Sequence, residues 1–140
     1  MLGRTVTNTT HIAPMLAVSD GAQAIDFYEA AFGAVERWRI NAGGAVIAGL
    51  SVDGADFFLA PASPPHGTHS PDALGGTTVR IELYVDDPQA TQARAVAAGA
   101  EERDPVTEHS HATTTGGSFR MLQGMVVDPF GHYWLIGKFL

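Results

Sequence analysis

The chain contains an internal repeat, which limits the folds open to it. At an offset of 67 residues, positions 15–20 (Met-Leu-Ala-Val-Ser-Asp) align with positions 82–87 (Glu-Leu-Tyr-Val-Asp-Asp). Each segment alternates before it ends in acidic turn residues, a pattern typical of a half-buried β-strand. The residues expected on the buried face are Ile12, Leu16 and Val18 in the first strand and Ile81, Leu83 and Val85 in the second. The repeat predicts two copies of one structural unit.

Each of these strands is followed by a helix signal. Asp20 can cap a helix over residues 21–32, and Gly33 supplies its C-terminal stop. Asp87 can cap a second helix, which Gly99 ends. The two halves of the chain therefore agree in element order as well as in residues.

Three strand-like runs follow each helix. They cover residues 35–42, 45–52 and 55–60 in the first half, and 101–108, 118–127 and 132–139 in the second. Both halves therefore consist of strand–helix–strand–strand–strand, a βαβββ module. The sequence predicts one α+β domain over residues 1–140. Its parts are module one over about 12–60, a linker rich in Pro, Gly and His over 61–76, and module two over about 77–139.

Composition excludes several classes of protein. The 140 residues include no cysteine, which excludes a disulfide scaffold, a cysteine zinc site, an iron–sulfur cluster and a thiol nucleophile. No apolar run approaches the length that spans a bilayer, and the N-terminus lacks the layout of a secretory signal. Fifteen acidic residues against eight basic ones give a net charge of −7, which repels phosphate backbones. We expect a soluble, cytoplasmic protein that binds neither nucleic acid nor membrane.

Three segments carry a family resemblance: residues 15–18, the helix segment 24–33, and the turn 127–134 (Val-Asp-Pro-Phe-Gly-His-Tyr-Trp). Combined with the two βαβββ modules, they resemble the vicinal oxygen chelate superfamily of glyoxalase I, extradiol dioxygenases and bleomycin-resistance proteins, most closely its PhnB-like branch. The resemblance covers residues 12–139. It implies an open, cup-shaped sheet with the helices on its outer face. It also implies a homodimer with a pocket between modules, to which a second chain often contributes.

The resemblance also implies where a metal would bind. Catalytic members of the superfamily hold a divalent ion with four side chains, one each from the first and last strand of each module. Those positions correspond here to Ala13, Phe58, Arg80 and Leu135. None of the four side chains can ligate a metal under ordinary conditions, and the permanent cation of Arg80 would repel one. We therefore predict no metal and no cofactor.

A displaced metal site remains an alternative. His11 and Glu82 lie on the expected cup face, but the sequence offers no third ligand beside them. Two histidine pairs have ligand-like spacing and are interpreted as solvated loop residues, because loops give no rigid geometry: His66 with His69, and His109 with His111.

Strand alternation predicts which residues line the cup. The candidate ligand-binding residues are Met15, Trp38, Phe58, Arg80, Glu82, Tyr84, Tyr133 and Leu135. Aromatic and aliphatic side chains around an Arg–Glu pair are typical of a small-molecule pocket. Arg80 and Glu82 should emerge roughly 7 Å apart, so that Arg80 could bind the carboxylate or phenolate of a flat ligand. In the alternative, Arg80 and Glu82 are a surface pair, and Met15 and Phe58 belong to the core.

The function expected from these features is metal-independent binding of a small molecule, an aromatic or anionic compound that the protein sequesters. The alternative is a lyase, isomerase or dioxygenase of the same superfamily. Such an enzyme would use either a displaced metal or Glu82 as base with Arg80 as electrostatic clamp. A third possibility is a dimeric scaffold whose cup is collapsed.

Overall fold

The computed structural model describes residues 9–140. Module one consists of β1 (Met15–Ala17), α1 (Gly21–Phe32), β2 (Val35–Ala42), β3 (Ala45–Val52) and β4 (Ala55–Ala60). The linker holds a single 3₁₀ turn (Pro64–His66) and the short helix α2 (Pro71–Leu74). Module two consists of β5 (Arg80–Tyr84), α3 (Pro88–Ala98), β6 (Glu101–Ala112), β7 (Ser118–Val127) and β8 (Tyr133–Phe139).

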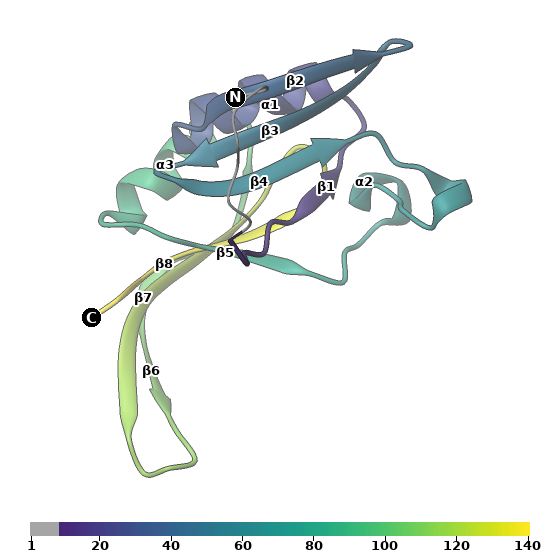
Figure 1. The fold of residues 1–140 in the computed structure, drawn as a ribbon. Coiled ribbons are helices and arrows are strands. Elements are labelled where there is room, and N and C mark those ends of the chain that lie inside the picture. Colours follow the sequence, from purple (N-terminus) through teal and green to yellow (C-terminus); the bar gives the residue numbers. More distant parts are fainter. Residues whose placement is uncertain (1–8) are drawn as a thin grey trace.

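Each module forms its own four-stranded mixed sheet, so the predicted α+β fold of two βαβββ modules is confirmed. The strand orders are β1-β4-β3-β2 and β5-β8-β7-β6, and the first strand of each module pairs in parallel with its last. The equivalence extends to single residues, because Met15 pairs with Phe58 as Glu82 pairs with Leu135. α1 lies behind the first sheet in Figure 1, so that none of the described helices covers the opposite face of that sheet. We call the face of each sheet that points away from the helices its cup face.

Both long helices begin and end at the predicted residues. The Asp20 carboxylate accepts a hydrogen bond from the Gln23 backbone N–H, and Asp87 does the same for Ala90. These bonds satisfy donors that a helix N-terminus leaves without intrahelical partners. Gly33 ends α1 with a φ of 67°, a left-handed conformation that favours glycine. In residues 9–140 no helix is long and apolar enough to cross a membrane.

An aromatic cluster joins the two modules. Phe27, Tyr28 and Phe32 are buried on the inner side of α1. The Trp134 ring, from β8 of the other module, lies 4.7 Å from the Phe32 ring centroid and 5.6 Å from that of Tyr28. The Phe57 ring of β4 contacts both Tyr28 and Trp134, at centroid distances of 5.2 Å and 5.6 Å. The core is therefore continuous across the module boundary.

A buried carboxylate at the Asp-Pro-Phe-Gly turn fixes this cluster. Asp128 accepts hydrogen bonds from the Tyr28 hydroxyl at 2.5 Å and from the Trp134 indole N–H at 2.9 Å. Its second oxygen accepts from the backbone N–H groups of Phe130 and His132. Burial and the neighbouring Asp128 charge raise the pKa of Tyr28 well above its usual value, so the phenol keeps the proton that it donates.

Two strands, β1 and β6, differ from the bounds or facing expected from the sequence. Ile12 was expected on the buried face of the first strand, but β1 begins only at Met15 and Ile12 is 95% exposed. The strand expected over 101–108 continues to Ala112, and β6 and β7 form an arm that projects from the molecule (Figure 1). His109 and His111 therefore lie in a paired strand, opposite Met121 and Phe119, and not in a loop.

Removing the one hydroxyl group that Tyr28 donates to Asp128 tests whether this hydrogen bond stabilises the fold. Tyr28→Phe removes a donor to a buried charged acceptor, and we expect it to lower the free energy of unfolding by about 2 kcal/mol. Tyr84→Phe is the matched control, because it also removes a Tyr-to-carboxylate hydrogen bond, but at an exposed site; its cost should stay within about 0.5 kcal/mol. Urea denaturation followed by circular dichroism measures both. Equal costs for the two variants would contradict the assigned role.

Candidate functional site

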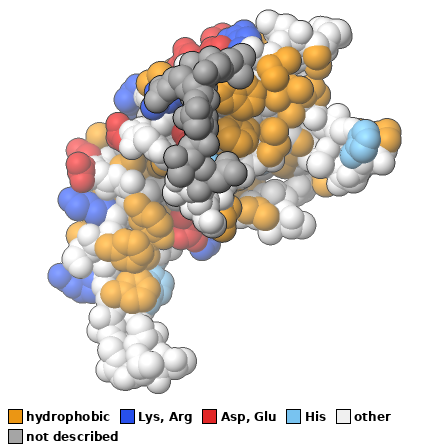
Figure 2. Space-filling model, in the orientation of Figure 1, with side chains coloured by type: hydrophobic (Ala, Val, Ile, Leu, Met, Phe, Trp, Pro, Cys, Tyr) orange, Lys and Arg blue, Asp and Glu red, His pale blue; other side chains and the backbone are white. Residues whose placement is uncertain are grey.

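The cup face of the first sheet carries a row of directly paired residues from all four of its strands. Met15 pairs with Phe58, Phe58 with Gly49, and Gly49 with Trp38. The Trp38 and Phe58 rings lie 5.5 Å apart between centroids and are tilted by 48°. In Figure 2, hydrophobic side chains gather on this face of the sheet. Three of the predicted binding residues, Met15, Trp38 and Phe58, are thus neighbours.

A cavity of about 570 Å³ opens beside this row. Its lining is Arg37, Trp38, Gly49, Leu50, Gly54, Asp56 and Phe58. Trp38 is 39% exposed, and Phe58 is half-buried between its strand neighbours. The cavity therefore combines aromatic side chains with one cationic and one anionic residue, a composition suited to a small organic molecule.

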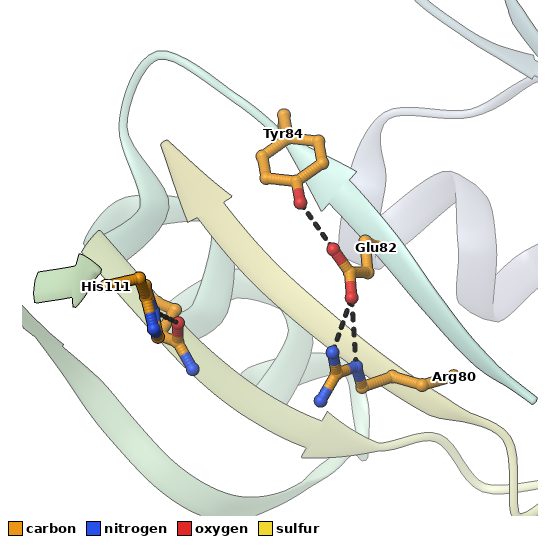
Figure 3. A network of polar contacts seen from close by, with 5 residues as sticks. Arg80, Glu82, Tyr84 and His111 are labelled. Atoms are coloured by element: carbon orange, nitrogen blue, oxygen red, sulfur yellow. Dashed lines mark hydrogen bonds and ion pairs between the residues drawn. The ribbon is translucent and has the colours of Figure 1, made fainter. Parts of the chain in front are cut away.

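The cup face of the second sheet carries an ionic network on β5. The Glu82 carboxylate accepts hydrogen bonds from the Arg80 guanidinium, at 2.5 Å from Nη2 and 3.1 Å from Nε, and from the Tyr84 hydroxyl. Figure 3 shows Glu82 between its two partners. The expected separation of roughly 7 Å is not kept. The two side chains bend toward each other and form an ion pair on the surface, as in the alternative interpretation of Arg80 and Glu82. Both charges are therefore engaged within the strand.

This network shifts two pKa values in opposite directions. The hydrogen bonds from Tyr84 and Arg80 stabilise the charged form of Glu82 and lower its pKa. The same hydrogen bond from Tyr84, with partial burial, raises the pKa of Tyr84 to about 12. Glu82 is consequently a weak proton acceptor near neutral pH, and Tyr84 stays protonated.

The two predicted residues of β8 differ in accessibility. Tyr133 is half-buried, and the Arg103 guanidinium lies over its ring at 5.8 Å from the centroid. Leu135 is only 2% exposed, which corrects its interpretation as a side chain that lines an open pocket. It belongs to the cup face but is covered there, and it sits beside Gly137 and Met121.

The eight predicted site residues form two groups. Met15, Trp38 and Phe58 belong to the first sheet, whereas Arg80, Glu82, Tyr84, Tyr133 and Leu135 belong to the second. The cavity beside Trp38 and Phe58 includes no residue of the second sheet. Glu82 and Tyr84 line a different cavity, of about 790 Å³, which lies against the β3–β4 turn and the ends of α1 and β5.

Sequence reasoning missed an aromatic run that leads from Tyr84 through Phe139 to the arm. Tyr84 stacks on Phe139 with centroids 4.8 Å apart, Phe139 contacts Phe119 at 5.8 Å, and Phe119 contacts His111 at 5.2 Å. Phe119 and Phe139 are 40% and 56% exposed. Alternation along β7 and β8 could have indicated this run, because Phe119 and Phe139 share a face with Met121 and Leu135.

At the four positions where the superfamily places metal ligands, the side chains have no ligating atoms for a divalent cation. Phe58 and Leu135 are apolar, and Arg80 is paired with Glu82. Ala13 precedes β1 and has no donor atom. No group of three or more His, Asp or Glu side chains within residues 9–140 is arranged to hold a metal ion.

Comparisons with known proteins agree with this architecture. A model of the glyoxalase/bleomycin resistance protein/dioxygenase superfamily matches residues 9–136. An uncharacterized protein of Mycobacterium bovis is 37% identical over 132 residues, which cover 91% of this chain and 82% of the relative. A gene product of Arabidopsis thaliana aligns with a TM-score of 0.67 and 26% identity, over 94% of this chain and 100% of its own. TioX from Micromonospora sp. ML1 aligns with a TM-score of 0.64 and 25% identity, over 92% and 95%. The sequence, the module topology and these matches agree: the chain belongs to the glyoxalase/bleomycin resistance protein/dioxygenase superfamily.

Proposed function

We propose that this protein binds and sequesters a small aromatic compound in its cup without a metal ion, in the manner of the binding proteins of its superfamily. The observation that carries the proposal is the Met15–Phe58–Gly49–Trp38 row beside a cavity of about 570 Å³. Apolar rings at an open cavity favour a flat organic ligand. The side chains at the four superfamily metal positions favour binding without a metal. The helix segment 24–33 and the turn 127–134 favour the PhnB-like branch.

The enzymatic alternatives have weaker support. A lyase or isomerase with Glu82 as base needs a carboxylate that accepts protons near neutral pH, whereas both oxygens of Glu82 are engaged and its pKa is lowered. Arg80 is occupied by the same ion pair and is poorly placed to act as a separate clamp. A displaced metal would need a third ligand near His11 and Glu82.

We also propose that the protein is a homodimer. The outer edges of the two sheets are strands β1, β2, β5 and β6, whose unpaired sides can pair with another chain. On the cup faces, Trp38, Tyr84, Phe119 and Phe139 are between 39% and 56% exposed. A second copy that covers part of this surface would remove apolar area from water. If the second copy lies over the cup, residues of both chains line the pocket.

Binding should depend on Phe58 and not on metal. The neutral probe N-phenyl-1-naphthylamine, which fluoresces more strongly in an apolar site, should bind with the same Kd after EDTA treatment and after addition of Mn²⁺, Ni²⁺ or Zn²⁺. Phe58→Ala should weaken binding about tenfold or more, because the lost ring contact is worth roughly 1.5–3 kcal/mol. Val96→Ala, on an exposed position of α3, is the matched control and should have no effect. Binding that disappears with EDTA would contradict the proposal.

The dimer can be tested by its mass. Light scattering at micromolar concentration should give twice the chain mass of 14.7 kDa. Replacing both Phe119 and Phe139 by Ser should raise the dimer dissociation constant tenfold or more, because apolar area is lost from the interface; a factor of ten corresponds to about 1.4 kcal/mol. Val96→Ser is the control and should leave this constant unchanged. A wild-type mass equal to one chain would reject the dimer.

A further inference from the structure

Among the arginines that the structure describes, Arg37 differs from the others in having no side-chain partner. Within residues 9–140, each of the other arginine side chains makes an ion pair or a hydrogen bond. The pairs are Arg39 with Glu36, Arg80 with Glu82, Arg94 with the Ala30 carbonyl, Arg103 with Glu101, and Arg120 with Glu108. Arg37 has no such contact in this part of the chain, so none of the described side chains occupies its five donors.

The backbone brings Arg37 to the cavity beside Trp38. The pairing of β2 with β3 shifts register between Glu36 and Trp38, so Arg37 is the extra residue of a β-bulge. A bulge redirects a side chain relative to regular alternation. As a result, both Arg37 and the next residue, Trp38, line the cavity of about 570 Å³.

Gly49 determines how Trp38 lies in that cavity. A Cβ atom on Gly49 would come within 2.4 Å of the indole Nε1 and 2.5 Å of Cε2, which are impossible contacts. The indole therefore rests directly on the β3 backbone and reaches toward Phe58, with 5.5 Å between ring centroids. Its other face stays partly exposed, as a platform on which a flat ring can stack.

We propose that Arg37, Trp38 and Phe58 form a subsite for a planar aromatic anion, with Gly49 as the residue that positions Trp38. This inference rests on the proposed small-molecule binding and adds the charge of the ligand and the residue that recognises it. The acidic group of the ligand binds Arg37 and not Arg80, because Arg80 is already engaged by Glu82. Asp56 lines the same cavity, where its carboxylate disfavours further anionic groups on the ligand.

Two fluorescent probes that differ only by a sulfonate test the charge. They are 8-anilino-1-naphthalenesulfonate and the uncharged N-phenyl-1-naphthylamine. Arg37→Gln should weaken the sulfonate about tenfold or more and leave the neutral probe within about twofold, because only a charge-assisted contact is lost. The controls are Arg39→Gln, two positions along the same strand, and Arg80→Gln; both should leave the two probes within about threefold.

The outcomes separate this inference from the proposed function. If both probes bind and depend on Phe58 but Arg37→Gln does not discriminate between them, the Arg37 subsite is wrong and the binding function stands. A selective loss in Arg80→Gln would likewise overturn the assignment in favour of Arg80. If neither probe binds the wild-type protein, both the function and the subsite are rejected.

The positioning role of Gly49 has its own readout, which needs no ligand. Gly49→Ala should lift the indole from the sheet and increase acrylamide quenching of Trp38 fluorescence, while the buried Trp134 contributes little quenching. It should weaken both probes about fivefold or more. In a Trp38→Ala background the added methyl group should change nothing further, because the two effects share one contact. Unchanged quenching, or additive losses in the double variant, would overturn the positioning role.

Discussion

The hydrogen bonds of the buried Asp128 carboxylate hold the two modules together. This carboxylate lies where α1 of one module meets the last hairpin of the other, and it accepts four hydrogen bonds. A buried carboxylate is costly unless its oxygens are satisfied, so the four donors are required by the burial. By holding Tyr28 and Trp134 together, Asp128 fixes how the modules are packed and how the two cup faces are oriented.

The modules share a fold but differ in the chemistry of their cup faces. In module two, the charges of Arg80 and Glu82 neutralise each other and engage Tyr84, so this face offers little unmet hydrogen-bonding capacity. In module one, aromatic rings stand beside a guanidinium that has no partner among residues 9–140. Duplication of one unit has thus produced one cup face whose charges are paired with each other and one whose guanidinium is unpaired among the described residues.

Much of this architecture could be predicted from the sequence, because it follows from local signals. The 67-residue repeat, the caps Asp20 and Asp87 and the stop Gly33 depend only on neighbours in the chain. The site was less predictable. Strand alternation predicts which face of the sheet a side chain lies on but not its rotamer, so it could not decide between a pocket-facing Arg80 and an ion pair of Arg80 with Glu82. Glycine is needed at position 49 because the Trp38 ring lies against it from the neighbouring strand, a contact that the sequence does not show. Arg37 reaches the cavity through a β-bulge, which composition does not reveal either.

The Tyr28–Asp128 hydrogen bond joins residues that are 100 positions apart in the chain. A newly made first module therefore lacks the acceptor of Tyr28 and the ring of Trp134 until the last strand of module two has been synthesised. Contacts of such separation carry a large loop-closure cost and slow the folding of a domain. Folding of this protein is thus expected to be a late, concerted event in which neither module becomes native alone. Expressed separately, each half would expose its share of the aromatic cluster and aggregate.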